Sequence, residues 1–203
     1  MKTNLILPAC LLALLSACSD IERTIFIRDD HDSNLPAYTE WGYNSFGAKY
    51  ERLYFFVHKS IVPCKITHWE GRLHFSLAGI LGEDTYGYYD SLYPETMTLT
   101  VSFPAEPMYE YRDLVALHGR VIDLADASCE VNIERTDQTG LTVTPIKGHL
   151  TFRRAQLLRI DEKENRVILS GNFDLQFLAN GKPESIADGR FDVGIYTDFY
   201  SFD

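Results

Sequence analysis

Two segments near the carboxyl end, residues 166–178 and 186–196, alternate apolar and polar side chains with a period of two. This period is typical of a β-strand with one buried face and one wet face, because successive side chains in a strand point to opposite sides. Asn180-Gly181 lies between the two segments and marks a turn. A third run, residues 147–160, precedes them and is separated by a turn at residues 161–165. The sequence therefore predicts three long neighbouring strands.

The second and third runs contain a short echo of each other. Gly171-Asn172-Phe173-Asp174 is matched by Gly189-Arg190-Phe191-Asp192, and two copies are too few for a solenoid. Asp174 and Asp192 fall on the polar face of neighbouring runs, where paired carboxylates can act as acid and base in glycoside cleavage. A solvated sheet face explains the same two residues more simply. We therefore predict no catalytic residues in this region.

Shorter runs of strand-like composition fill the middle of the chain, and turn residues separate them. Residues 129–135 and 141–144 flank a turn and are expected to form a hairpin, and Asp113 is expected to begin a short helical turn. The earlier runs are residues 48–57, 71–80, 96–103 and 121–124. We predict an all-β fold, an antiparallel β-sandwich or partly closed β-barrel of about eight or nine strands, with little helix beyond the signal peptide.

The amino-terminal segment has the features of a processed signal sequence. Lys2 precedes an apolar run, residues 5–15, that is shorter than the ~20 residues needed to cross a bilayer. The run ends in Leu15-Ser16-Ala17-Cys18, which resembles the lipobox of bacterial lipoproteins. That resemblance implies cleavage before Cys18, a diacylglycerol on its thiol and an acyl chain such as palmitate on the new amino terminus. The alternative is a plain secretory signal with an incidental cysteine.

The residues after Cys18 bear on where such a lipoprotein would be held. Ser19-Asp20-Ile21-Glu22 is similar to the signal that exports Bacteroidota lipoproteins to the outer face of the outer membrane. The resemblance implies a lipid-anchored protein of the outer membrane, exposed on the cell surface. We expect a signal peptide at residues 1–17, an acidic tether at residues 18–38 and a single β domain at residues 39–203.

The expected tether contains Asp30-x-Asp32-x-Asn34, which imitates the start of a calcium-binding loop. An EF-hand loop would also require glycine at its sixth position and glutamate at its twelfth, where Leu35 and Trp41 stand instead. We therefore expect a solvated tether and no metal ion.

Residues 35–48 form a distinctive stretch between the tether and the strands. Gly42 and Gly47 permit unusual backbone angles, and Asn44 can form an Asx-turn. Trp41 and Phe46 are expected to seat this stretch on the core. The sequence thus predicts a loop that leads into the first strand.

The same stretch, Leu35-Pro36-Ala37-Tyr38-Thr39 followed by Gly42-Tyr43-Asn44-Ser45-Phe46-Gly47, resembles the opening of a family of Bacteroidota surface lipoproteins. The pattern of that family is Leu-Pro-Pro-Ala-Thr, then Gly-x-Asn-Thr-Phe-Gly. The phrases Ser170-Gly171-x-Phe173 and Asp188-Gly189-Arg190-Phe191-Asp192 resemble the carboxyl-terminal parts of its members. The resemblance implies a small β-structured surface lipoprotein with no assigned activity.

Charge and cysteine content narrow the function further. With 29 acidic and 19 basic residues the chain has a formal net charge of −10, which argues against binding nucleic acid phosphates. Cys10 would leave with the signal, so Cys64 and Cys129 remain in an oxidising compartment. A disulfide between them would stabilise the fold by about 4 kcal/mol on the chain-entropy model. Two free thiols are the open alternative.

A tyrosine-rich segment is the strongest candidate binding site in the sequence. Its members are Tyr86, Tyr88, Tyr89 and Tyr93, and exposed tyrosines offer apolar faces with polar tips to a sugar or a protein partner. The six histidines show no metal-ligand spacing, although His68 and His74 are expected to lie near each other across a turn. We expect a non-catalytic module, without cofactor or metal, that binds a glycan, a peptide or a partner protein. A structural envelope component is the alternative, and a hydrolase ranks last.

Overall fold

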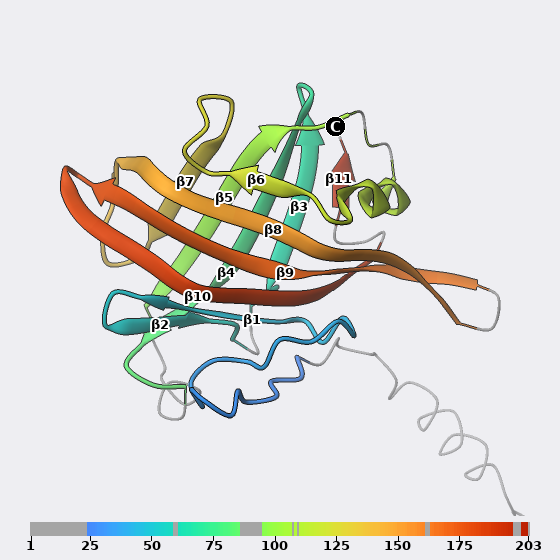
Figure 1. Ribbon diagram of the computed structural model, residues 1–203, viewed down its shortest axis with the longest axis horizontal. Helices are drawn as coiled ribbons and strands as arrows, with labels where there is room; N and C mark the ends of the chain where they lie inside the picture. Colours follow the sequence, from blue (N-terminus) through green and yellow to red (C-terminus); the bar gives the residue numbers. More distant parts are fainter. Residues whose placement is uncertain are drawn as a thin grey trace, which may run out of the picture.

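The computed structural model describes residues 24–58, 61–85, 95–106, 108, 110–160, 163–196 and 200–202. The described chain is almost entirely β-structure with one short 3-10 helix (Figure 1). Its elements are β1 (Ser45–Tyr50), β2 (Leu53–Phe56), β3 (Cys64–Trp69), β4 (Arg72–Gly82), β5 (Thr96–Pro104), η2 (Tyr111–Leu117), β6 (Val121–Asp123), β7 (Glu130–Arg135), β8 (Val143–Ile160), β9 (Lys163–Ala179), β10 (Lys182–Ile195) and β11 (Tyr200–Phe202).

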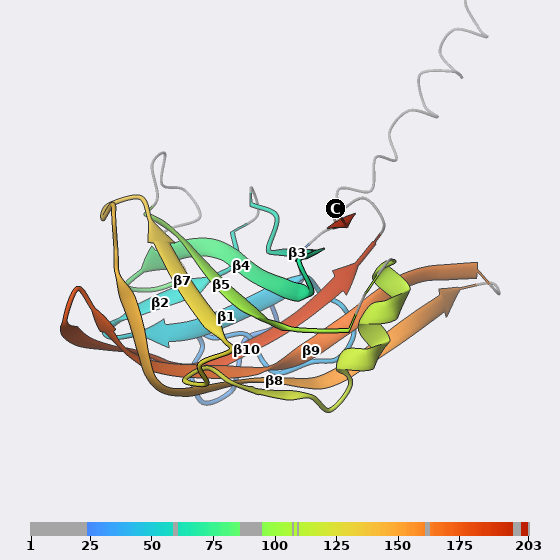
Figure 2. The ribbon, with the colours of Figure 1, turned by 90° about the horizontal axis from the view of Figure 1, so that it is seen from above.

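The strands form one curled sheet in the order β11-β3-β4-β2-β1-β10-β9-β8-β6, and β5 joins β4 and pairs in turn with β7. Neighbouring strands are antiparallel, except that β11 runs parallel to β3. Figure 1 shows the long strands β8, β9 and β10 crossing in front of β3, β4 and β5, and Figure 2 shows the sheet curving round between these two layers. The predicted all-β antiparallel fold is confirmed, and of its two predicted forms, sandwich or partly closed barrel, the curled sheet is the second; its described part has 11 strands where eight or nine were expected.

The inward-facing side chains form a single core rich in phenylalanine. Phe152 of β8 lies at its centre, with its ring centroid 5.3 Å from that of Phe75, 5.7 Å from that of Phe191 and 6.1 Å from that of Phe103. These four rings come from β4, β5, β8 and β10, so they join both layers of the curled sheet. Burial of each ring contributes roughly 1.5–3 kcal/mol.

The sequence echo is explained by the pairing of β9 with β10. Gly171 pairs with Phe191, and Phe173 pairs with Gly189, so each copy places its glycine opposite the phenylalanine of the other. A Cβ atom on Gly171 would lie 2.7 Å from the Phe191 ring, and one on Gly189 would lie 2.7 Å from the Phe173 ring. The glycines therefore make room for the facing rings.

One predicted turn is confirmed, whereas one predicted strand and one predicted hairpin differ from the structure. Asn180 and Gly181, both with positive φ, connect β9 to β10 in a two-residue turn, as the Asn-Gly signal predicts. The predicted strand at residues 48–57 is instead two strands, β1 and β2, joined by a tight turn at residues 51–52. The predicted hairpin of residues 129–135 with 141–144 is wrong, because β7 pairs with β5 while β8 pairs with β9 and β6.

The segment predicted as a solvated tether packs on the sheet over its described part, residues 24–38. Leu35 is fully buried. Asp29 forms an ion pair with Arg190 of β10 at 2.6 Å, and Asp32 forms one with Lys49 of β1 at 3.1 Å. The packed domain therefore begins before Thr39. Within the described ranges, the structure holds no helix long and apolar enough to cross a membrane.

Two side chains of the calcium-like motif, those of Asp32 and Asn34, form hydrogen bonds within the protein. The Asp32 carboxylate accepts hydrogen bonds from the Tyr54 hydroxyl and from the backbone N–H of Asn34. The Asn34 side-chain oxygen accepts hydrogen bonds from the backbone and hydroxyl of Thr85. Among the residues that the structure describes, no three His, Cys, Asp or Glu side chains are grouped as metal ligands.

Candidate ligand-binding recess

A buried carboxylate on β10 fixes residues 39–43 onto the outer face of the sheet. Asp192, only 2% exposed, accepts hydrogen bonds from the backbone N–H groups of Trp41, Gly42 and Tyr43 at 2.7–3.3 Å. It also accepts hydrogen bonds from the hydroxyls of Thr39 at 2.6 Å and Ser170 at 2.9 Å. Three successive amides and two hydroxyls therefore point at one side chain, which holds residues 39–44, here called the strap, against the sheet.

The glycine and asparagine of the strap allow it to approach the sheet closely. Gly42 has φ +72°, and a Cβ atom there would lie 3.3 Å from Ile168 and 3.4 Å from the Gly194 backbone. The Asn44 side-chain oxygen accepts a hydrogen bond from the Gly194 N–H at 2.9 Å. Gly47 has a different role, because a Cβ atom there would lie 2.4 Å from Pro36.

Trp41 is presented to solvent by this strap. The expectation that Trp41 seats the segment on the core is wrong: 70% of its surface is exposed, whereas Phe46 is fully buried as expected. The physical reason is that the strap is held through its backbone, by Asp192, and needs no aromatic anchor at this position. An indole on a fixed backbone loses little conformational freedom when a ligand stacks on it.

A recess of about 390 Å³ lies between the strap, the end of η2 and β8, and the residue that the strap contributes to it, Glu40, directly precedes Trp41 in the chain. The strap contributes Glu40, the residue after η2 is His118, and β8 contributes residues 153–156, which are Arg153, Arg154, Ala155 and Gln156. The strand register shifts between Phe152 and Arg154, and the consecutive residues Arg153 and Arg154 both line the recess. Its volume lies at the lower end of the range for ligand pockets, and all its side chains except Ala155 are polar.

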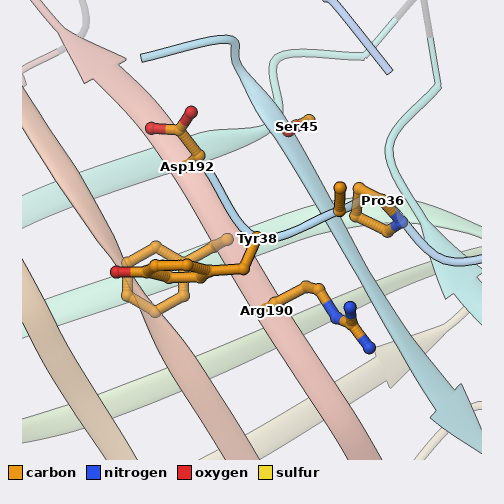
Figure 3. Close-up of a pocket in the computed structure, with 7 residues that line it drawn as sticks. Pro36, Tyr38, Ser45, Arg190 and Asp192 are labelled. Atoms are coloured by element: carbon orange, nitrogen blue, oxygen red, sulfur yellow. The ribbon is translucent and has the colours of Figure 1, made fainter. Parts of the chain in front are cut away.

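A network of hydrogen bonds organises the strap side of the recess. Glu40 accepts a 2.7 Å bond from Arg154 and a 2.8 Å bond from the hydroxyl of Tyr38. The Arg154 bond is the main cause that lowers the pKa of Glu40, and the Tyr38 hydroxyl adds to it. The pKa of Tyr38 is raised, first by burial and then by the Glu40 carboxylate. Tyr38 itself lines a second, smaller pocket, which is the one drawn in Figure 3, together with Pro36, Ser45, Arg190 and Asp192.

The other side of the recess presents hydrogen-bond donors. The backbone N–H of Ala155 donates to Nδ1 of His118 at 3.3 Å, so the neutral imidazole carries its proton on Nε2. The guanidinium of Arg153 lies over the Tyr38 ring, 5.4 Å from its centroid. Arg153, His118 and the Arg154–Glu40 pair together offer planar donors and one carboxylate, a set that can bind hydroxyl and acidic groups.

The structure does not bring the predicted carboxylate pair together. Asp192 pairs in register with Ser170, and Asp174 lies four residues further along β9, about 13 Å away at ~3.3 Å per residue. Glycosidase carboxylates are typically about 5–9.5 Å apart. The reciprocal pairing of the echo is the cause, because antiparallel copies send their aspartates to opposite ends.

The two histidines of the β3–β4 hairpin lie on opposite faces of the sheet. His68 pairs with the buried Leu73, and His74 pairs with Thr67, so their side chains alternate in direction. The His74 ring stacks on Trp69 at 5.1 Å and contacts the Ser102 hydroxyl at 2.7 Å. Burial, followed by the charge of Arg72, lowers the pKa of His74.

The remaining predicted sites are placed as follows. Tyr86, Tyr88, Tyr89 and Tyr93, together with Cys18, lie outside the described residues. Cys64 and Cys129 are free thiols, because β4 and β5 lie between β3 and β7 and keep them at least about 14 Å apart at ~4.8 Å per strand. A disulfide requires Cα atoms closer than about 7 Å. Burial raises the pKa of the Cys129 thiol to about 11.

The sequence did not predict this recess because the residues that line it are far apart in the chain. Glu40 and Arg154, for example, are 114 residues apart. The Arg153-Arg154 doublet within an alternating strand was the available signal, since a doublet breaks the period of two. Comparisons of this chain with protein-family models, with curated proteins and with solved structures found no match.

Proposed function

We propose that this chain is a non-catalytic glycan-binding module, lipid-anchored through Cys18 and held at the bacterial outer membrane with its domain exposed on the cell surface. The observation that carries the binding role is the exposed Trp41, whose backbone is held by Asp192 and which directly follows Glu40 of the polar recess. An exposed indole one residue from a recess of planar hydrogen-bonding groups suits a sugar ring, which has both apolar and hydroxyl-bearing sides.

The lining of the recess favours a glycan over a peptide. Protein ligands are usually held by aromatic or aliphatic anchors inserted into desolvated apolar pockets. Here Ala155 is the single apolar side chain of the lining, beside Glu40, Gln156, His118 and two arginines. Such side chains match hydroxyl groups and give a buried apolar anchor little to contact.

Trp41→Ala should weaken binding of the mature domain to its glycan at least about tenfold, which corresponds to about 1.4 kcal/mol. The stacking surface would be lost while the fold is kept, because 70% of the side chain is already exposed. A glycan array followed by titration calorimetry measures the affinity, and thermal unfolding measures the stability.

The matched control is Trp69, the second of the two tryptophans in the chain. It is 46% exposed on β3, stacks on His74 and is not part of the recess lining. Trp69→Phe should leave affinity unchanged and leave Trp41 as the only indole fluorophore, so that its emission reports ligand binding directly. If wild type and Trp41→Ala bind every glycan with equal affinity, the proposed glycan-binding role of Trp41 is contradicted.

Cys18→Ala should move the protein from the membrane fraction to the soluble fraction and leave it without lipid. The thiolate is the nucleophile that takes the diacylglycerol, and alanine has none. Cell fractionation and intact mass measurement check both effects, with Cys10→Ala as the matched control. Unchanged membrane partitioning of Cys18→Ala would contradict the anchor assignment.

A further inference from the structure

The charge in the recess is opposite in sign to the charge of the whole chain. Its charged lining consists of Arg153, Arg154 and Glu40, with His118 beside them, while the chain has a formal net charge of −10. The acidic surface as a whole repels anions, but the positive charge in the recess would attract an anionic group there and repel a cationic one. Such a local charge implies a partner of complementary charge.

The positive charge available to a ligand is that of Arg153. Arg154 is neutralised by Glu40 at 2.7 Å. Arg153 has no hydrogen bond or ion pair with any carboxylate in the part of the chain that the structure describes, and its guanidinium is stacked over Tyr38. Stacking restricts the side chain while leaving its N–H donors available, so less entropy is lost when an anion binds.

We infer that the recess holds the acidic group of an anionic glycan, a uronate carboxylate or a sulfate ester, against the guanidinium of Arg153. The Nε2–H group of His118 lies in the same lining and supplies a second donor. Both anions are planar or tetrahedral oxyanions that a guanidinium binds through two parallel hydrogen bonds. This inference rests on the proposed glycan-binding function and adds the chemical class of the ligand.

Four probes separate the two sources of negative charge. Oligogalacturonate carries carboxylates, and its methyl ester has the same sugars without charge. A carrageenan oligosaccharide carries sulfate, and its desulfated form is neutral. Titration calorimetry of the mature domain at physiological salt should give an affinity for at least one anionic probe about 10- to 100-fold higher than for its neutral partner, as expected for hydrogen bonds to a charged group.

The variant that tests the residue is Arg153→Gln, which keeps a polar side chain and removes the charge. It should reduce the preference for the anionic probe to less than about threefold. Arg52→Gln makes the same change of net charge in the exposed turn between β1 and β2, at the opposite end of β1 from the strap, and should keep the full preference. Arg153→Lys should keep part of it, because lysine retains the charge without the planar fork.

Each outcome decides between the two proposals. Preference for one anionic probe, lost in Arg153→Gln and kept in Arg52→Gln, supports the inference and identifies carboxylate or sulfate as the group. Equal binding of charged and neutral forms, weakened by Trp41→Ala, would overturn it while leaving the glycan-binding function intact. Binding of neither these probes nor any glycan on an array would overturn both.

Discussion

Replacing Asp192 by alanine should lower the free energy of unfolding by about 3–5 kcal/mol, one of the two largest effects we expect from a single change. The carboxylate accepts five hydrogen bonds, and its removal leaves the amides of residues 41–43 without their acceptor. Each buried donor left unsatisfied costs about 1–3 kcal/mol, although water can reach some of these groups after the loss. Urea denaturation followed by circular dichroism measures the change.

Asp174→Ala is the matched control, because Asp174 occupies the equivalent position in the sequence echo but is exposed. Its effect should stay within about 0.5 kcal/mol. Asp192→Asn should lose nearly as much stability as Asp192→Ala. The amide replaces one carboxylate oxygen by an NH₂ group, and its two N–H donors would face backbone N–H groups that need an acceptor. A loss below 1 kcal/mol for Asp192→Ala would mean that the strap is held by other contacts.

Replacing Phe152 by alanine should cost about 3–5 kcal/mol, the usual range for a buried phenylalanine. The ring is fully buried and contacts three other phenylalanine rings from different strands. Its loss would leave a cavity that the rigid strand ladder cannot close. For a domain of this size the melting temperature should fall by roughly 6–20 °C.

Ile160→Ala serves as the comparison for Phe152→Ala, since Ile160 ends β8 and is 48% exposed. Its loss should be within about 1 kcal/mol, because most of the removed surface already meets water. Calorimetry should show one transition for both variants if the single core unfolds as a unit. Similar losses at the two positions would contradict the central role of the ring cluster.

The strands of the carboxyl-terminal third were predictable from sequence because their determinants are local. Alternation of side chains defines a strand wherever one face is buried, and Asn180-Gly181 defines its turn. Strand partners are not local, and that is why β7 pairs with β5 across the fold instead of with its neighbour in sequence. A turn between two strand-like runs shows only that the chain reverses there.

The candidate site was beyond prediction for the same reason. Asp29 and Asp32 in the docked segment, residues 24–38, look solvated in the sequence. Their cationic partners, Arg190 and Lys49, are brought to them only by folding. Trp41 looks like a core residue by its chemistry alone. Its exposure follows from Asp192, which is 151 residues away and holds the backbone beside it.

The docking of residues 24–38 on the sheet limits how far the domain can lie from the membrane. The backbone N–H of Ile25 donates to the carbonyl of Tyr43 at 2.8 Å, so the chain leaves the barrel two residues from Trp41. Only six residues lie between Cys18 and Ile25, and the seven residue-to-residue steps span at most about 25 Å. With the lipid on Cys18 as proposed, a short linker joins the barrel to the membrane, and it meets the barrel at Tyr43, three residues along the chain from Glu40 of the recess. The protein would then meet glycans that lie at the membrane surface itself, and ligands far from the bilayer would be out of range.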